Sequence, residues 1–106
     1  MKKLTFKTTG EWNLQGSSKK RLYISLMTKV DDWKKSVIFY RSDVGEEVFD
    51  LLLQFTDEEK PRVDWTFSII EGGRYMNSVF ASQILSISDE TGRVVFEENN
   101  ELDNQY

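Results

Sequence analysis

The segment VIFYRSDVGEEVFDLLLQF, residues 37–55, decides the fold, because its hydrophobic pattern changes period within a few residues. Residues 37–40 form a short apolar run of the kind found in a central strand. Apolar residues then recur at spacings of four, three, one and three, which places them on one face of a helix. The residues expected to pack this face into the core are Val44, Val48, Leu51, Leu52 and Phe55.

Helix-terminus signals indicate where this helix begins and ends. Asp43 is the expected N-cap, and Glu46, three residues later, completes a pattern similar to a capping box. We expect the helix to end near Phe55, before the polar residues 57–61. The segment therefore predicts a strand followed closely by one amphipathic helix.

The sequence before this segment has the two-residue period of strands. Residues 4–9 alternate between an apolar and a polar face, and Gly10 is the expected position of a bend or bulge. Residues 16–20 are typical of a loop, and residues 21–29 alternate again. Residues 31–35 are predicted to form a polar connection that contains one aromatic side chain. Two strands therefore precede the apolar strand at residues 37–40.

The sequence after the helix predicts a hairpin. Residues 63–70 alternate as a strand, and the paired glycines within residues 71–74 predict a tight turn, since such turns require positive φ. Residues 75–87 are the expected partner strand. Residues 89–92 are predicted to turn, and residues 93–96 could add a short strand.

The resulting order is strand, strand, strand, helix, strand, strand, which is the layout of an OB-fold. We therefore predict an all-β protein with one helix: a five-stranded OB-fold Greek-key barrel, with the helix between strands 3 and 4. Residues 1–96 are assigned to this domain, and residues 97–106 to a flexible, disordered acidic tail.

Composition excludes several kinds of chemistry. The chain of 106 residues contains no Cys and no His, so disulfides, thiol nucleophiles and imidazole acid–base catalysis are excluded. Adjacent acidic residues on a strand point to opposite faces, which makes them poor paired ligands, and we expect neither an enzyme nor a cofactor. No apolar run approaches the roughly 20 residues that cross a bilayer, and no signal peptide is evident, so a cytoplasmic location is expected.

Charge is distributed unevenly along the chain. The net charge is −4, but residues 89–106 carry six acidic residues and one basic residue. Residues 1–88 then hold 12 acidic and 13 basic residues and are close to neutral. The acidic balance of the whole chain is therefore a property of its C-terminal part, and it does not exclude a polyanionic partner for the rest.

Two segments, the second together with the glycine hairpin before it, resemble bacterial and phage single-stranded DNA-binding proteins of the OB-fold type. Residues 33–40 followed by 46–52 are similar to that family's Trp, basic residues, Val-x-Phe strand and acid-Val-x-x-x-Leu helix. Residues 72–74 resemble its Gly-containing hairpin, and residues 75–84 its last strand. The resemblance implies binding of single-stranded DNA without sequence preference, in replication or recombination, by a chain that could form homo-oligomers.

The resemblance also implies a role for the C-terminal tail. In the family this tail is acidic and ends in an aromatic residue that docks on replication partners. The composition of residues 97–106 is similar, with acidic residues before a terminal Tyr. The residues expected to contact replication or recombination proteins are Glu97, Glu98, Glu101, Asp103 and Tyr106.

Aromatic rings interleaved with cations are the side chains that binding to a single strand requires, because bases stack on the rings and cations contact the phosphates. We expect Trp65, which shares a face with Phe67, to belong to the core instead. The expected stacking residues are Trp12, Tyr23, Trp33, Tyr40 and Tyr75. The expected phosphate-binding residues are Lys7, Lys19, Lys20, Arg21, Lys34, Lys35, Arg41 and Arg74.

Two other classes of function fit the composition. A small acidic protein-interaction module, or a phage-encoded inhibitor that mimics nucleic acid, would use the tail and the acidic cluster at residues 57–59 as its interface. A structural subunit of a larger assembly is a weaker alternative. Within the favoured hypothesis DNA and RNA stay open, because discrimination depends on contacts near the 2′-OH.

Overall fold

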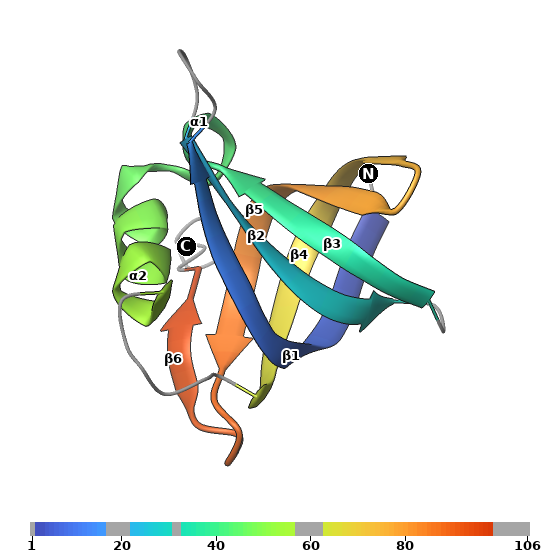
Figure 1. Ribbon diagram of the computed structural model, residues 1–106. Helices are drawn as coiled ribbons and strands as arrows, with labels where there is room; N and C mark the ends of the chain where they lie inside the picture. The colour runs from blue at the N-terminus through green and yellow to red at the C-terminus, as the bar shows by residue number, and fades with distance from the viewer. Residues whose placement is uncertain (1, 17–21, 31–32, 57–62, 99–106) are drawn as a thin grey trace, which may run out of the picture.

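Six strands and two helices make up the part of the chain that the computed structural model describes, residues 2–16, 22–30, 33–56 and 63–98. The helices lie between the third and fourth strands in chain order (Figure 1). The strands are β1 (Lys2–Gly16), β2 (Leu22–Val30), β3 (Trp33–Tyr40), β4 (Val63–Tyr75), β5 (Ser78–Ser88) and β6 (Val94–Glu97). The helices are α1 (Arg41–Val44) and α2 (Glu46–Thr56).

Five of the strands form a closed barrel, as the sequence predicts. Antiparallel pairing gives the order β3-β2-β1-β4-β5-β6, and parallel pairing of β3 with β5 closes the ring. Val37 and Val79 are partners in this closing pair. The sixth strand, β6, adds to β5 outside the ring and lies near α2 in Figure 1. The architecture is an OB-fold-like barrel with one extra strand.

The barrel interior is filled by the apolar residues that alternate along each strand. Phe67 is fully buried, and its ring lies 5.7 Å from the Phe6 ring and 5.8 Å from the Phe39 ring, centroid to centroid. Helix α2 adds Phe49 and Leu52 to this core. Val44, Val48 and Leu51 pack against it, as does the half-buried Trp65.

Strand β1 belongs to both sides of the barrel because it is bent in the middle. Its first half pairs with β4, and its second half pairs with β2. The register against β2 shifts between Thr8 and Glu11, which confirms the irregularity predicted at Gly10. The buried Thr8 hydroxyl accepts a hydrogen bond of 3.1 Å from the Trp65 N–H, and the buried Thr28 hydroxyl donates to the Lys7 carbonyl. The two buried threonine hydroxyls near the bend are thereby paired.

The predicted N-cap at Asp43 is wrong, because Gly45 divides the helical segment in two. Helix α1 begins at Arg41, and Asp43 lies inside it. Gly45 has a φ of 98°, a conformation that favours glycine, and its N–H bonds the Arg41 carbonyl at 3.1 Å. The Gly45 carbonyl then accepts a bond of 2.9 Å from the Phe49 N–H, so α2 starts from this residue.

The predicted turn at residues 71–74 is also displaced. Gly72 and Gly73 lie inside β4, and the chain turns at Met76 and Asn77, with Tyr75 and Ser78 paired. Gly72 is needed for close approach, since a Cβ there would lie 3.1 Å from the Ser82 Cβ. Gly72 therefore allows two strands to come close at a register shift, and neither Gly72 nor Gly73 supplies positive φ.

The chain remains paired slightly beyond the predicted domain boundary at residue 96. Strand β6 includes Glu97, and the Glu98 N–H donates to the Leu85 carbonyl at 2.8 Å. The predicted turn before this strand is present at residues 89–92, where Gly92 has a φ of 92°. Neither helix in the described ranges has the length and apolar character to cross a membrane.

Candidate nucleic-acid interface

Three aromatic side chains form a row on the outer surface of β2, β3 and β5. Tyr23 and Tyr40 are cross-strand partners, and their neighbours Ile24 and Phe39 are buried, so both tyrosines lie on the outward phase. Their ring centroids are 5.2 Å apart, with the rings edge to face. The Tyr40 ring is nearly parallel to the Phe80 ring, at 8° and 6.3 Å. We call Tyr23, Tyr40 and Phe80 the aromatic row.

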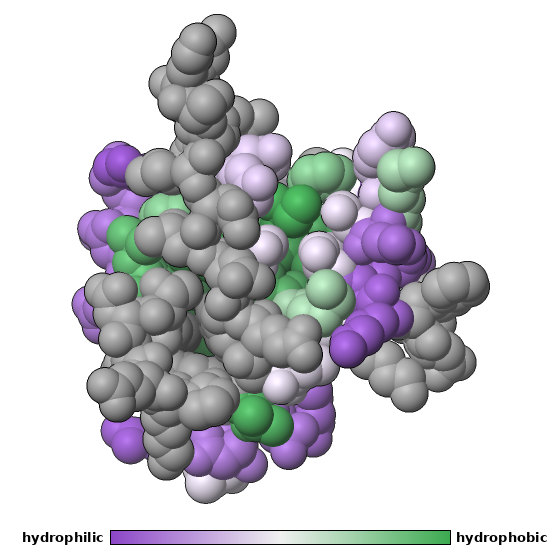
Figure 2. Space-filling view, in the orientation of Figure 1, coloured by the Kyte–Doolittle hydropathy of each residue, from purple (hydrophilic) through white to green (hydrophobic). Residues whose placement is uncertain are grey.

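Apolar and small polar residues continue this surface along the strands. Ile38, two residues before Tyr40, pairs with Ser25 of β2 and with Phe80 of β5. Met27 pairs with Ser36 at the next outward position, and all of these side chains are half-buried. Figure 2 shows green and near-white residues in the middle of the side on which β1, β2 and β3 cross in front of β4 and β5.

The adjacent cations Lys34 and Lys35 have different positions on the barrel. Lys34 is exposed and shares the outward phase of Ile38 and Tyr40. It lies six residues before Tyr40, a separation of roughly 20 Å along the strand. Lys35 is the partner of the buried Thr28 and lies on the opposite phase. The structure therefore places only one of these two predicted phosphate contacts on the face of the aromatic row.

Two predicted phosphate-binding arginines have carboxylate partners within the chain. The Arg41 guanidinium bonds both oxygens of Glu46 at 2.7 Å, and this hydrogen bond, with the ion pair, raises the pKa of Arg41. The Arg74 Nε bonds Glu71 at 2.5 Å. Each arginine therefore forms a locally neutral pair, and a phosphate would have to compete with a carboxylate for it.

The β4–β5 hairpin carries Tyr75, one of the predicted stacking residues, close to β3. Tyr75 is 67% exposed and Met76 is 78% exposed, at the tip of the hairpin. The Asn77 carbonyl accepts a hydrogen bond of 2.9 Å from the Ser36 N–H, which attaches the tip to β3. Met76 has a φ of 55°, which is uncommon for a residue with a side chain of this size. The hairpin tip thus lies near the beginning of β3, where Lys34 is located.

The remaining predicted residues are placed only in part. Lys7 is exposed and pairs with Thr66 of β4, so it lies over a different part of the barrel. Trp33 is the first residue of β3 and not part of a loop, and Trp12 lies in β1; their side chains are outside the described residues. Outside the described residues altogether are Lys19, Lys20, Arg21, Glu101, Asp103 and Tyr106. The predicted acidic interface at residues 57–59 is outside them as well.

Phe80 is the member of the aromatic row that the sequence analysis does not select. Its neighbours Val79 and Ala81 are both buried, so Phe80 has the outward phase of β5. The alternation of residues 78–82 carries that signal. The sequence did not show that Phe80 lies next to Tyr40, because β5 contacts β3 only when the barrel closes.

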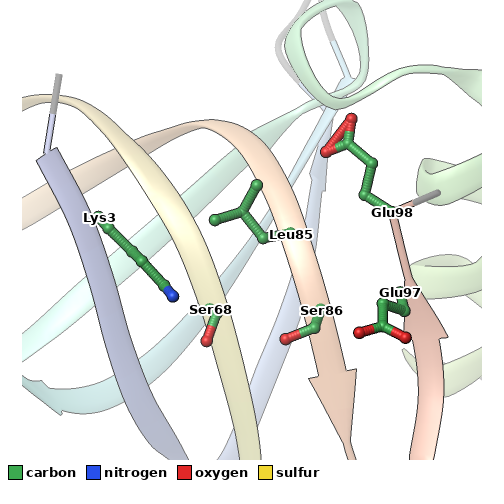
Figure 3. Close-up of a pocket in the computed structure, with 6 residues that line it drawn as sticks. All are labelled: Lys3, Ser68, Leu85, Ser86, Glu97 and Glu98. Carbon is green, nitrogen blue, oxygen red and sulfur yellow. The ribbon is translucent and has the colours of Figure 1, made fainter. Parts of the chain in front are cut away.

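A shallow concavity lies on the outer side of β1, β4, β5 and β6, apart from the aromatic row. Its volume is about 260 Å³. Lys3 and Glu97 extend toward each other over Ser68 and Ser86 (Figure 3). Glu97 and Glu98, which the sequence assigns to partner docking, therefore line surfaces of the folded barrel. Within the described ranges, no group of three or more acidic residues is placed to hold a metal ion.

Comparisons with protein-family models, with curated proteins and with solved structures give no match for this chain.

Proposed function

We propose that this protein binds single-stranded DNA without sequence preference, through base stacking on the aromatic row. The observation that carries the proposal is the position of Tyr23, Tyr40 and Phe80 on the outer face of β2, β3 and β5. The face of strands 2 and 3 is where OB-folds bind oligonucleotides and oligosaccharides. The resemblance of the sequence to single-stranded DNA-binding proteins supports a nucleic acid as the ligand, in replication or recombination.

The arrangement of the rings suits stacking. Tyr23, Tyr40 and Phe80 are half-buried, so their side chains are held by neighbours while part of each ring stays accessible. Rings that are already ordered lose little conformational freedom when a base binds. Stacking on an aromatic side chain contributes about 1–3 kcal/mol per base and tolerates every base, since each has a π-face. A row of three rings therefore favours binding without sequence readout.

Phosphate contacts support stacking in this proposal, and they come from few residues. Lys34 is exposed at one end of the face, next to the β4–β5 hairpin tip. By sequence, Lys19, Lys20 and Arg21 join β1 to β2 directly before Leu22. Because Arg41 and Arg74 are paired with carboxylates, we expect a modest salt dependence of binding.

A titration of the whole chain with fluorescein-labelled oligonucleotides tests this proposal. The probes are oligo-dT and oligo-rU of about 20 nucleotides, enough to cover the site of one OB-fold, and a duplex of the same length. We expect a saturable rise in anisotropy with oligo-dT that weakens as salt increases, and much weaker binding of the duplex. The proposal is wrong if oligo-dT gives no change up to high micromolar protein, or if the duplex binds equally well. Equal binding of oligo-rU would extend the ligand to RNA.

A further inference from the structure

A groove runs between the helices and the β5–β6 edge of the sheet. Its volume is about 580 Å³, within the usual size range of ligand-binding sites. Its apolar lining comes from Val44 of α1, Val48 of α2, Ile84 of β5 and Phe96 of β6. Ile84 is buried in the core, and the other three side chains pack against that core, so the apolar lining is preformed.

Acidic residues surround this apolar lining, and the carboxylate of one of them, Glu97, points instead toward Ser86 and Lys3 (Figure 3). Asp43 and Glu47 come from the two helices, and Glu97 and Glu98 come from the end of β6. The Glu98 carboxylate accepts a hydrogen bond of 2.7 Å from the Gln83 side-chain amide, which fixes its position at the groove. The described residues that line the groove include no Lys or Arg. The described lining of the groove thus combines an apolar surface with acidic side chains.

We infer that this groove binds a segment of another protein in which an apolar side chain is flanked by Lys or Arg. The apolar residue would contact the preformed lining, and its basic neighbours would face the carboxylates of Asp43, Glu47 and Glu98. The chain's own C-terminal residues are a poor occupant, because residues 99–106 carry Glu101 and Asp103 and no basic residue. A nucleic acid is a poor occupant for the same reason of like charge.

The groove lies close to the aromatic row along the chain. Ser82 lines the groove two residues after Phe80, and Asp43 follows Tyr40 by three residues. The inference does not require the proposed function, because it rests only on the shape and charge of the groove.

The test uses a short, amidated, fluorescein-labelled peptide in which Lys and Arg alternate with Leu, with a matched peptide that has Ser in place of Leu. We expect wild-type protein to bind the Leu peptide at low salt, and the Ser peptide on the order of tenfold more weakly, because apolar burial is lost. Glu47→Lys, at an exposed position, should weaken binding of the Leu peptide on the order of tenfold.

Glu90→Lys is the matched control, since Glu90 is exposed in the β5–β6 turn and the change in net charge is identical. The inference is overturned if Glu90→Lys weakens binding of the Leu peptide as much as Glu47→Lys does. It is equally overturned if the Ser and Leu peptides bind with the same affinity. It is also overturned if sedimentation shows self-association that Glu47→Lys abolishes, because the occupant is then a second copy. Oligo-dT affinity of Glu47→Lys should be no lower than wild type, which separates failure here from failure of the proposed function.

Discussion

Replacing Tyr40 with Leu removes the central ring of the aromatic row while it keeps a smaller apolar side chain at that position. The Tyr40 ring lies between those of Tyr23 and Phe80, at centroid distances of 5.2 and 6.3 Å. Tyr40→Leu should therefore remove one stacking surface for a base, and Tyr40→Phe should keep it. Both variants lack the Tyr40 hydroxyl, so the comparison between them reports the loss of the ring.

The two effects of this replacement can be estimated separately. Loss of one base stack should cost about 1–3 kcal/mol of binding free energy, a rise of roughly 5- to 150-fold in the Kd for oligo-dT. Two aromatic contacts within the protein are also lost, at about 0.5–1.5 kcal/mol each in the free energy of unfolding. Domains of this size are typically stable by about 5–15 kcal/mol, so the fold should survive.

Fluorescence anisotropy with labelled oligo-dT measures the first effect, and thermal unfolding followed by circular dichroism measures the second. Tyr40→Phe should bind within about twofold of wild type, because its π-face is retained. If folded Tyr40→Leu binds oligo-dT as tightly as Tyr40→Phe does, bases do not stack on Tyr40 and the site assignment is refuted.

Three further predictions concern charge, a turn and the core. Lys34→Gln should lower the log–log salt slope of oligo-dT binding by about 0.7, as for one phosphate contact on a single strand; an unchanged slope would remove Lys34 from the site. The Asp89 carboxylate accepts hydrogen bonds from the Thr91 hydroxyl and from the Thr91 and Arg93 N–H groups, at 2.7, 2.9 and 2.9 Å, and the Thr91 hydroxyl is the main cause of its lowered pKa. Asp89→Ala should therefore lower Tm at neutral pH, and the difference from wild type should shrink as pH falls from the unfolded value, near 3.9, through the lowered folded value; a difference that does not change with pH would contradict this. Phe67→Ala should cost about 3–5 kcal/mol in urea unfolding, because two neighbouring rings lose their partner; a loss under about 1 kcal/mol would mean that the core collapses to fill the space.

The order of the strands and the helix predicted the barrel layout, and alternation predicted the inward positions, because these are set locally. Phe6, Ile24 and Phe67 are all buried at the positions that alternation assigns to the core. The glycines were less informative about where the chain turns, since glycine is used both for positive φ and for close approach of two strands. Gly72 allows close approach to Ser82, whereas a sequence pattern alone cannot distinguish this from a need for positive φ.

The candidate site was predicted less completely, because it depends on contacts between distant segments. Alternation places Tyr23 and Tyr40 outward, and the structure adds that they are direct neighbours. The contribution of Phe80 depends on the β3–β5 pairing, which no local pattern encodes. Likewise, the partner of Arg41 became evident only when Gly45 brought Glu46 to the start of a second helix.

The bend in β1 has a consequence for how the protein unfolds. Because one continuous strand supplies neighbours to both β2 and β4, loss of β1 would break the pairing on both of its sides. We therefore expect a single cooperative transition, with amide protons of both halves of β1 exchanging only through global opening. Heat or denaturant would then disrupt the aromatic row in a single step, without a partly folded state that retains part of it.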